Sequence, residues 1–248
     1  MSRHVSGWLG WALALLVAAS FCGLGYWQLG RMQQKRVMLE AAQRVLAERR
    51  ALPLSVANDP ARANGVDWVA GKGGFAARPP LLLDNQTRAG RAGVRVYRLF
   101  YSHQSKQELL VDMGWLPLQG ARRMPTRRSL GGDFMGKEWE IRGLLAPPPS
   151  AGLKLGPALQ KQDDGTWLMT RIDMVSIKQA EGHKALQLGL RVLKLDPALP
   201  LGYERDLDVL PNTMPPERHL GYAVQWFGLA LAVLITALVL TLRRRRRR

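Results

Sequence analysis

His219 stands just before a long apolar stretch, and two aromatic residues follow it at helical spacing. Tyr222 and Trp226 lie three and seven residues further along the chain, so all three side chains share one face of a helix. A neutral imidazole can ligate haem iron axially, and aromatic rings can stack on a flat macrocycle. The pattern indicates either a haem-binding site or an ordinary aromatic belt with an interfacial histidine, and composition alone favours the belt.

A second set of candidate residues closes the N-terminal apolar stretch. Trp27 and Gln28 are followed one turn later by Arg31. If the two apolar helices are antiparallel neighbours, this set meets His219 at the same depth. Arg31 and Arg218 could then pair with the carboxylates of a porphyrin. The predicted cofactor-binding residues are His219, Tyr222, Trp226, Trp27, Gln28, Arg31 and Arg218, with His219 as the candidate metal ligand.

The remaining histidines and the single cysteine favour no other metal site. His103 and His183 lie in polar stretches typical of the surface, and His4 flanks the first apolar stretch. Cys22, the lone cysteine, falls inside that stretch. The chain therefore has no intramolecular disulfide and no cysteine-based zinc or redox centre.

The sequence contains none of the common catalytic motifs. Asp84, Asp112 and Asp173 come near predicted strand ends, where carboxylates could do acid–base work. Turn and capping chemistry explains them better, but a membrane-tethered periplasmic enzyme stays as one alternative. The glycine-rich Gly71–Phe75 precedes no apolar helix, and we expect it to be a turn.

Two uncharged stretches position these candidates. Residues 5–30 and 220–242 each exceed the roughly 20 residues that a bilayer core requires. We therefore expect one transmembrane helix over 5–30 and another over 218–242, which begins with Arg218 and His219. Residues 31–217 form the domain between them, and 243–248 form a polyarginine tail.

The net charge is +17, and the distribution of the basic residues predicts the membrane topology. Six terminal arginines predict a cytoplasmic C-terminus, and two spans put the N-terminus on the same side. The central domain is then periplasmic, in a bacterial inner membrane, because the short N-terminal flank leaves no room for a transit peptide. The tail lacks the interleaved aromatics of a nucleic-acid surface, so we expect no nucleic-acid partner, whereas anionic lipid can bind it.

The central segment is predicted to be mainly antiparallel β-sheet with a few helices, which makes the whole chain an α+β membrane protein. Helices are expected over Arg31–Arg50 and from Asp173 to about Glu181. Alternating or apolar runs bounded by turn residues indicate strands. These runs are Leu81–Asp84, Val94–Ser102, Gln107–Leu118, Glu138–Arg142, Thr166–Asp173 and Leu190–Asp196.

Five phrases in order resemble one protein family over nearly the whole chain. They are GYWQLGRMQQK (Gly25–Lys35), GRAGVRVYRLF (Gly90–Phe100), LLVDMGWLP (Leu109–Pro117), WLMTRID (Trp167–Asp173) and PPERHLGYAVQWF (Pro215–Phe227). The chain thus resembles the Surfeit locus protein 1 family, assembly factors for haem–copper cytochrome c oxidase. Gln34, Asp112 and Met113 depart from the family pattern, and an arginine expected at one of the last two places is absent.

This resemblance implies a non-enzymatic role in which haem a is bound and passed to oxidase subunit I. It implies oxidase subunit I and other assembly factors as partners. His219 matches the family's candidate haem ligand. A scaffold that holds subunit I without binding haem is the alternative within the family. The family's motif residues fall on Trp27, Gln28 and Arg31 in the first span and on Tyr222, Gln225 and Trp226 in the second.

Overall fold

A computed structural model describes residues 2–118, 120, 122–131, 135–149, 156–180, 187–209 and 214–246, with side chains from residue 8 onward. The chain divides into two compact units. We call residues 1–37 with 213–248 the helical hairpin, and residues 38–212 the β domain. Each unit is described by itself.

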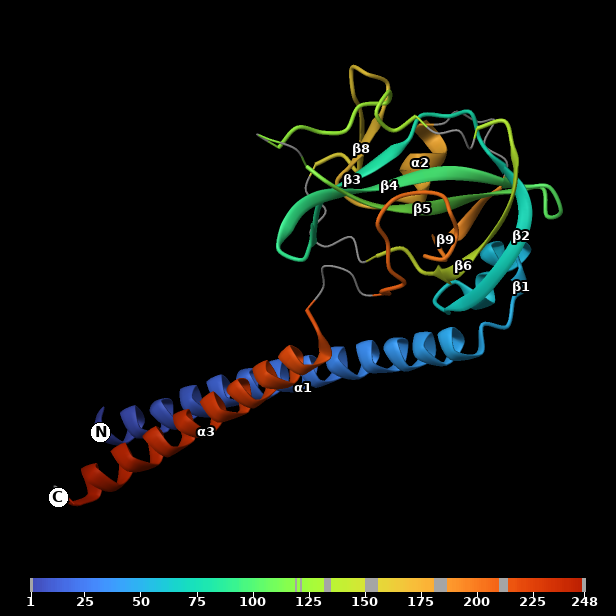
Figure 1. Cartoon of the computed structure of the whole chain (residues 1–248). Helices are drawn as coiled ribbons and strands as arrows, with labels where there is room; N and C mark the ends of the chain where they lie inside the picture. The colour runs from blue at the N-terminus through green and yellow to red at the C-terminus, as the bar shows by residue number, and fades with distance from the viewer. Residues whose placement is uncertain are drawn as a thin grey trace. The chain divides into compact units, whose positions relative to one another are not determined.

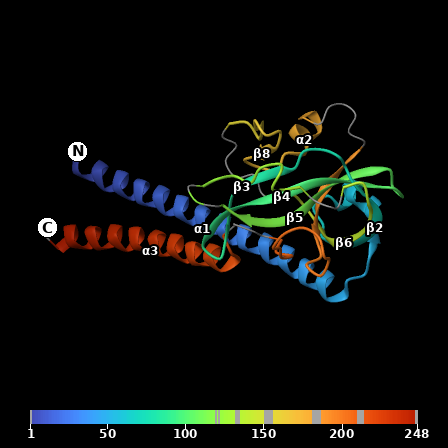
Figure 2. The ribbon, with the colours of Figure 1, turned by 45° about the horizontal axis from the view of Figure 1, so that its top comes forward.

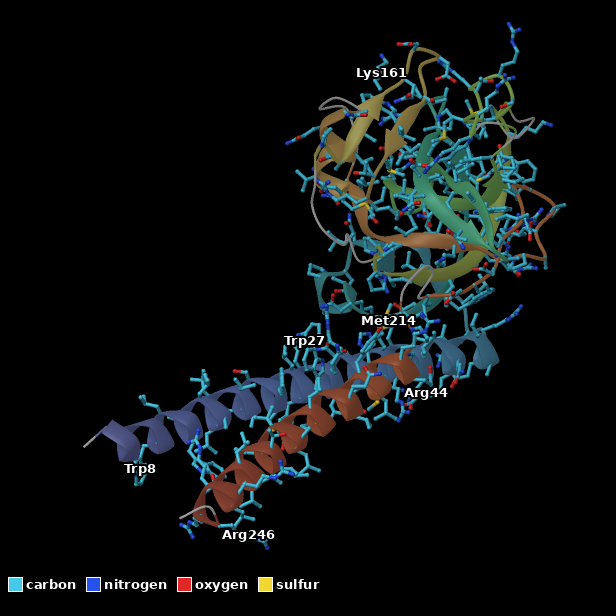
Figure 3. All side chains as sticks on the ribbon, turned by 90° about the vertical axis from the view of Figure 1, so that its left-hand side faces the viewer. Trp8, Trp27, Arg44, Lys161, Met214 and Arg246 are labelled. Carbon is cyan, nitrogen blue, oxygen red and sulfur yellow. The ribbon has the colours of Figure 1, made fainter. Side chains whose placement is uncertain are left out.

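The helical hairpin pairs the two long apolar helices that the sequence predicts. Helix α1 spans Ser2–Glu48 and helix α3 spans Pro216–Arg246. The most apolar 18-residue windows of the two helices have mean hydropathies of 1.8 and 2.3, which are high enough for a membrane crossing. The two chain ends lie at the same end of the hairpin, as do Trp8 and Arg246 (Figures 1 and 3). The expectation of antiparallel neighbours is therefore confirmed.

Small, aromatic and a few polar residues line the seam between α1 and α3. Contacts every three or four residues are those of two helices packed at a shallow angle. Phe227 lies against Gly25, where a Cβ atom would come within 2.7 Å of its ring. Phe21 and Trp226 pack with ring centroids 5.4 Å apart. The seam positions are Ala14, Ala18, Phe21, Gly25, Gln28, Met32 and Lys35 on α1 and His219, Ala223, Trp226 and Ala230 on α3.

The β domain is built on a closed ring of five strands, among them β2, β4, β5 and β6, which are labelled in Figure 2. The ring runs β2–β6–β9–β5–β4 and closes because the last residues of β4 pair with β2. Strands β3, β8 and β7 continue the sheet beyond β4, and β1 pairs with β2. The bounds are β1 Leu52–Pro53, β2 Asp67–Phe75, β3 Leu81–Arg88, β4 Arg91–Ser102, β5 Gln107–Pro117, β6 Glu138–Ala146, β7 Leu159–Lys161, β8 Trp167–Met169 and β9 Leu188–Leu195, with 3-10 helices η1 Leu54–Asn58 and η2 Pro60–Arg62 and helix α2 Met174–Ala180.

The alternation of side chains along each strand creates three apolar clusters. One face of the ring strands forms the largest cluster, which includes Phe100 and Val111 and fills the ring. On the other face of β4, β5 and β9, a second cluster contains Ile177 of α2. A third cluster packs Ala42, from the end of α1, against Trp68. Most pairings are antiparallel, as predicted, although β1–β2, β3–β8 and β5–β9 are parallel.

The prediction of a turn at Gly71–Phe75 is wrong, because these residues form the second half of β2. Gly73 pairs with both Ser102 of β4 and Trp139 of β6. A Cβ atom at Gly73 would lie 2.0 Å from the carbonyl oxygen of Tyr101. Here glycine permits a close approach of backbones rather than a chain reversal, and this approach closes the ring.

Candidate functional site

His219 lies in the first turn of α3, on the face that packs against α1. Its side chain is 8% exposed. Nδ1 lies 2.6 Å from Oε1 of Gln28, which belongs to α1. With the Gln28 amide in this orientation its oxygen can only accept a hydrogen bond, so Nδ1 carries the ring proton. The other ring nitrogen, Nε2, is left with its lone pair.

That lone pair has no partner within the described part of the chain. Nε2 of His219 is buried and accepts no hydrogen bond there. A buried polar atom left unsatisfied costs about 1–3 kcal/mol, so its presence needs an explanation. Histidines that bind metals donate one ring N–H to a protein acceptor and use the other nitrogen as ligand. Gln28 and His219 already have this arrangement.

The aromatic residues predicted around His219 divide between the seam and the outer surface. Trp226 lies on the seam with His219, seven residues further along. Tyr222 is 42% exposed, because a step of three residues turns the side chain about 60° away from that of His219. Ala223 occupies the neighbouring seam position and is buried. The predicted shared face therefore holds for His219 and Trp226, while Tyr222 lies at its margin.

The remaining predicted residues surround this end of the hairpin without a hydrogen bond to His219. Trp27 is 56% exposed, and the Arg31 guanidinium lies 5.9 Å from its ring centroid. Arg31 also donates a hydrogen bond to Gln34. Arg218 is exposed. Of the six other predicted site residues, Gln28 is the one that the structure brings into hydrogen-bonding contact with His219.

Lys35 is a site neighbour that the sequence interpretation missed. Its ammonium group donates a hydrogen bond to the backbone carbonyl of Met214, just before α3 begins. Lys35 and Arg31 both lie near enough to His219 to interact with it electrostatically. The signal for Lys35 was its position seven residues after Gln28, which places both on one face of α1. A heptad reading of α1 would have found it.

The three aspartates considered for acid–base chemistry each have a separate structural contact. Asp112 is buried and forms ion pairs with Arg95, at 2.8 Å, and with Lys194, at 3.6 Å. Asp173 caps α2 through hydrogen bonds from the Val175 amide and the Ser176 hydroxyl. Asp84 accepts a hydrogen bond from the amide of Asn85.

The three aspartates do not supply the pair of free carboxylates that the enzyme alternative needs. The second carboxylate near Asp112 belongs to Asp206, and Arg95 pairs with both. The departures from the family pattern at Asp112 and Met113 are also buried. These two residues therefore belong to the domain interior and not to a docking surface.

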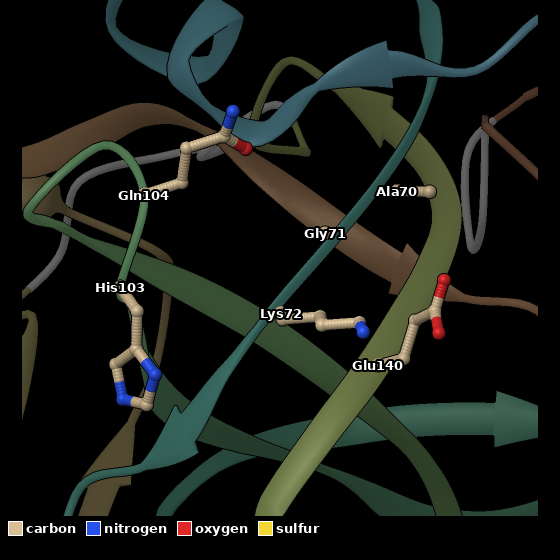
Figure 4. A pocket seen from close by; sticks show the side chains of 6 residues that line it. All are labelled: Ala70, Gly71, Lys72, His103, Gln104 and Glu140. Atoms are coloured by element: carbon tan, nitrogen blue, oxygen red, sulfur yellow. The ribbon is translucent and has the colours of Figure 1, made fainter.

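The β domain also carries a surface hollow of about 530 Å³. Lys72 of β2 extends across it toward Glu140, its cross-strand neighbour on β6 (Figure 4). His103 is exposed, as predicted, and lies on the other side of β2, 3.4 Å from Glu138. The residues described include no group of three or more potential metal ligands. His183 lies outside the described residues, as does the side chain of His4.

Fold and site together define a membrane-anchored protein that carries one unsatisfied histidine nitrogen between two apolar helices. A comparison with curated proteins found no match. A sequence model of the SURF1 family matches residues 15–231, which include most of α1, the whole β domain and the first half of α3. The chain belongs to the SURF1 family, whose members act in cytochrome c oxidase assembly.

Proposed function

We propose that this protein binds haem a through His219 and assists its insertion into subunit I of a haem–copper cytochrome c oxidase. The observation that carries the proposal is the buried, unpartnered Nε2 of His219, whose ring is already held through Nδ1 by Gln28. A neutral histidine nitrogen is an axial ligand for haem iron. Membership of a family that acts in oxidase assembly supplies the biological context.

The hairpin supports a specific placement in the membrane. The arginines that end α3 favour the cytoplasmic side, and the first turn of α1 lies at the same end of the hairpin (Figure 1). Both termini are then cytoplasmic, the β domain is periplasmic, and the membrane is the bacterial inner membrane. His219, near the start of α3, lies at the periplasmic end of the hairpin.

The residues at this site fit a haem group, because they offer one axial ligand for the iron together with aromatic and cationic side chains. His219 would provide the iron ligand, and Trp27, Tyr222 and Trp226 would provide aromatic surface. Arg31 and Arg218 would pair with the porphyrin carboxylates. When bound, the haem supplies iron that can change oxidation state. Because Nε2 is covered in the protein, haem binding must displace the groups that cover it.

The proposal is tested by purifying the full-length protein from cells that make haem a and recording reduced-minus-oxidised spectra. We expect wild type to carry a haem a signal that falls strongly in His219→Ala at matched protein levels. His103→Ala is the control, because it removes an exposed histidine of the β domain and should leave the signal unchanged. An equal signal in His219→Ala and wild type would overturn the ligand assignment.

Oxidase assembly in His219→Gln distinguishes haem delivery from the scaffold alternative. Glutamine keeps much of the packing at this position but lacks the imidazole nitrogen. We expect this variant to fail in oxidase assembly although the protein accumulates normally. Normal assembly would instead indicate a scaffold that holds subunit I while other assembly factors insert the haem.

A further inference from the structure

Gln28 and His219 are 191 positions apart in the sequence and are joined by a hydrogen bond across the seam of the hairpin. Gln28 lies on α1 between two seam positions that contact the C-terminal segment of the hairpin. One is Gly25, which is buried against Phe227. The other is Lys35, which binds the carbonyl of Met214. The amide of Gln28 is therefore attached to a packed part of the helix pair.

A second hydrogen bond between the helices shows what a purely structural contact in this hairpin is like. Nε1 of Trp11 donates to Oγ1 of Thr241 at 3.0 Å, and the same hydroxyl donates to the carbonyl of Ala237. This pair leaves no unpartnered nitrogen. The pair of Gln28 and His219 instead satisfies Nδ1 and leaves Nε2 buried with a free lone pair.

We propose that Gln28 is a positioning residue that fixes His219 as the tautomer protonated on Nδ1, so that Nε2 is held ready to bind an electron-pair acceptor. The identity of that acceptor as haem iron rests on the proposed function, whereas the tautomer is a property of the cofactor-free protein. A hydrogen bond to the far nitrogen sets which ring nitrogen is free to bind a metal. It also orients the ring.

A neutral amide at this position has a further consequence for the ligand. A carboxylate acceptor would draw the Nδ1 proton more strongly and make the imidazole a stronger electron donor. The amide of Gln28 accepts the same proton without adding a charge. Gln28→Glu should thus keep the tautomer and the haem but lower the reduction potential of the bound iron. Gln28→Leu should lose the tautomer preference.

The first measurement is ¹⁵N NMR of the histidine rings in full-length, cofactor-free protein in detergent. Comparison with His219→Gln identifies the signals of His219. We expect wild type and Gln28→Glu to show the tautomer protonated on Nδ1, and Gln28→Leu to shift toward protonation on Nε2. Thr241→Val is the matched control, because it removes the other hydrogen bond between the helices and should leave the His219 signals unchanged.

The second measurement is an absorbance titration of the same proteins with haem a. We expect Gln28→Leu to weaken binding about 10- to 100-fold, the range found when an outer-shell partner of a metal ligand is lost. Thr241→Val should bind like wild type. An unchanged tautomer in Gln28→Leu would overturn the role of Gln28 whatever the titration shows. If Gln28→Leu shifts the tautomer but wild type does not bind haem, the role of Gln28 is supported and the proposed function is overturned.

Discussion

The hairpin and the β domain treat buried polar groups in opposite ways. In the β domain, charged side chains pair with other charges or with backbone carbonyls. Arg191, which is fully buried, lies 2.6 Å from both a carboxylate oxygen of Asp67 and the carbonyl oxygen of Val56. In the hairpin, few polar groups enter the seam, and His219 keeps an open nitrogen there. The buried charges of the β domain therefore stabilise its fold, whereas the buried nitrogen of His219 can bind a ligand.

An unpartnered atom alone does not make this distinction. In the β domain, the hydroxyl of Ser105, the amide oxygen of Gln107 and Nε of Arg191 are also buried and have no hydrogen bond to any residue that the structure describes. A neutral hydroxyl and amide are poor ligands for iron, and a guanidinium nitrogen has no lone pair to offer. The imidazole of His219 is the group whose chemistry matches its position. Residue type and burial together therefore point to the hairpin.

The largest expected effect tests whether the buried charges of the β domain are structural. Asp112→Asn leaves Arg95 and Lys194 without their shared buried carboxylate. Removing one partner of such a pair costs about 3–5 kcal/mol, so we expect the free energy of unfolding to fall by that amount. Thermal and denaturant unfolding of the full chain, followed by near-UV circular dichroism, measure it.

The control for this charge change is Asp163→Asn. Asp163 is exposed, so its loss removes the same charge without leaving a buried cation. We expect a change of less than about 0.5 kcal/mol. Equal losses in the two variants would show that net charge, and not the buried pairs, controls stability. The buried charges of the β domain would then not be what stabilises its fold.

A medium effect compares close packing in the two regions. Gly73→Ala places a methyl group against the backbone oxygen of Tyr101 in the β domain, whereas Gly25→Ala meets the ring of Phe227 in the hairpin. Paired backbone cannot move away, but a side chain can turn. We expect Gly73→Ala to cost at least the 1–3 kcal/mol typical of overpacking, and Gly25→Ala to cost less, by the same unfolding measurements.

Neighbouring glycines provide controls for both substitutions. A Cβ atom at Gly74 would lie 3.6 Å from the nearest carbonyl oxygen, and one at Gly23 would meet nothing within 4 Å. Both alanine variants should fold as wild type does. If Gly74→Ala destabilises the protein as much as Gly73→Ala, the close approach at Gly73 is not what requires glycine.

The smallest expected effect concerns the cap of α2. The Ser176 hydroxyl hydrogen bond, partly opposed by burial, and the amide hydrogen bonds lower the pKa of Asp173. A carboxyl group whose pKa is lowered by folding stabilises the protein at pH values above its unfolded-state pKa. This stability is lost as the pH falls through the folded-state pKa. Asp173→Ala should cost about 1 kcal/mol at neutral pH, and the cost should shrink in acid. Urea unfolding across the acid range measures this, and a pH-independent difference would contradict it.

The sequence predicted some parts of the molecule well and missed others for identifiable reasons. Most strands are predicted from short apolar or alternating runs bounded by turn residues, and Asp173 is placed correctly at the start of its helix. Strand β2 was missed because its glycines resemble a turn. The backbone approach that requires Gly73 joins residues of two other strands. Local sequence carries no sign of such a contact.

For the site, hydropathy and helical periodicity were enough to predict the apolar helices at both ends of the chain and to place His219 and Gln28 near the same end of the helix pair. They were enough because both are local properties of the sequence. Tertiary structure decided which residue contacts His219 and which ring nitrogen stays free. Those outcomes depend on how α1 and α3 rotate about their axes when they pack. That rotation depends on the small residues of the seam and on the ring of Phe227 against Gly25, which are contacts between residues far apart in the sequence.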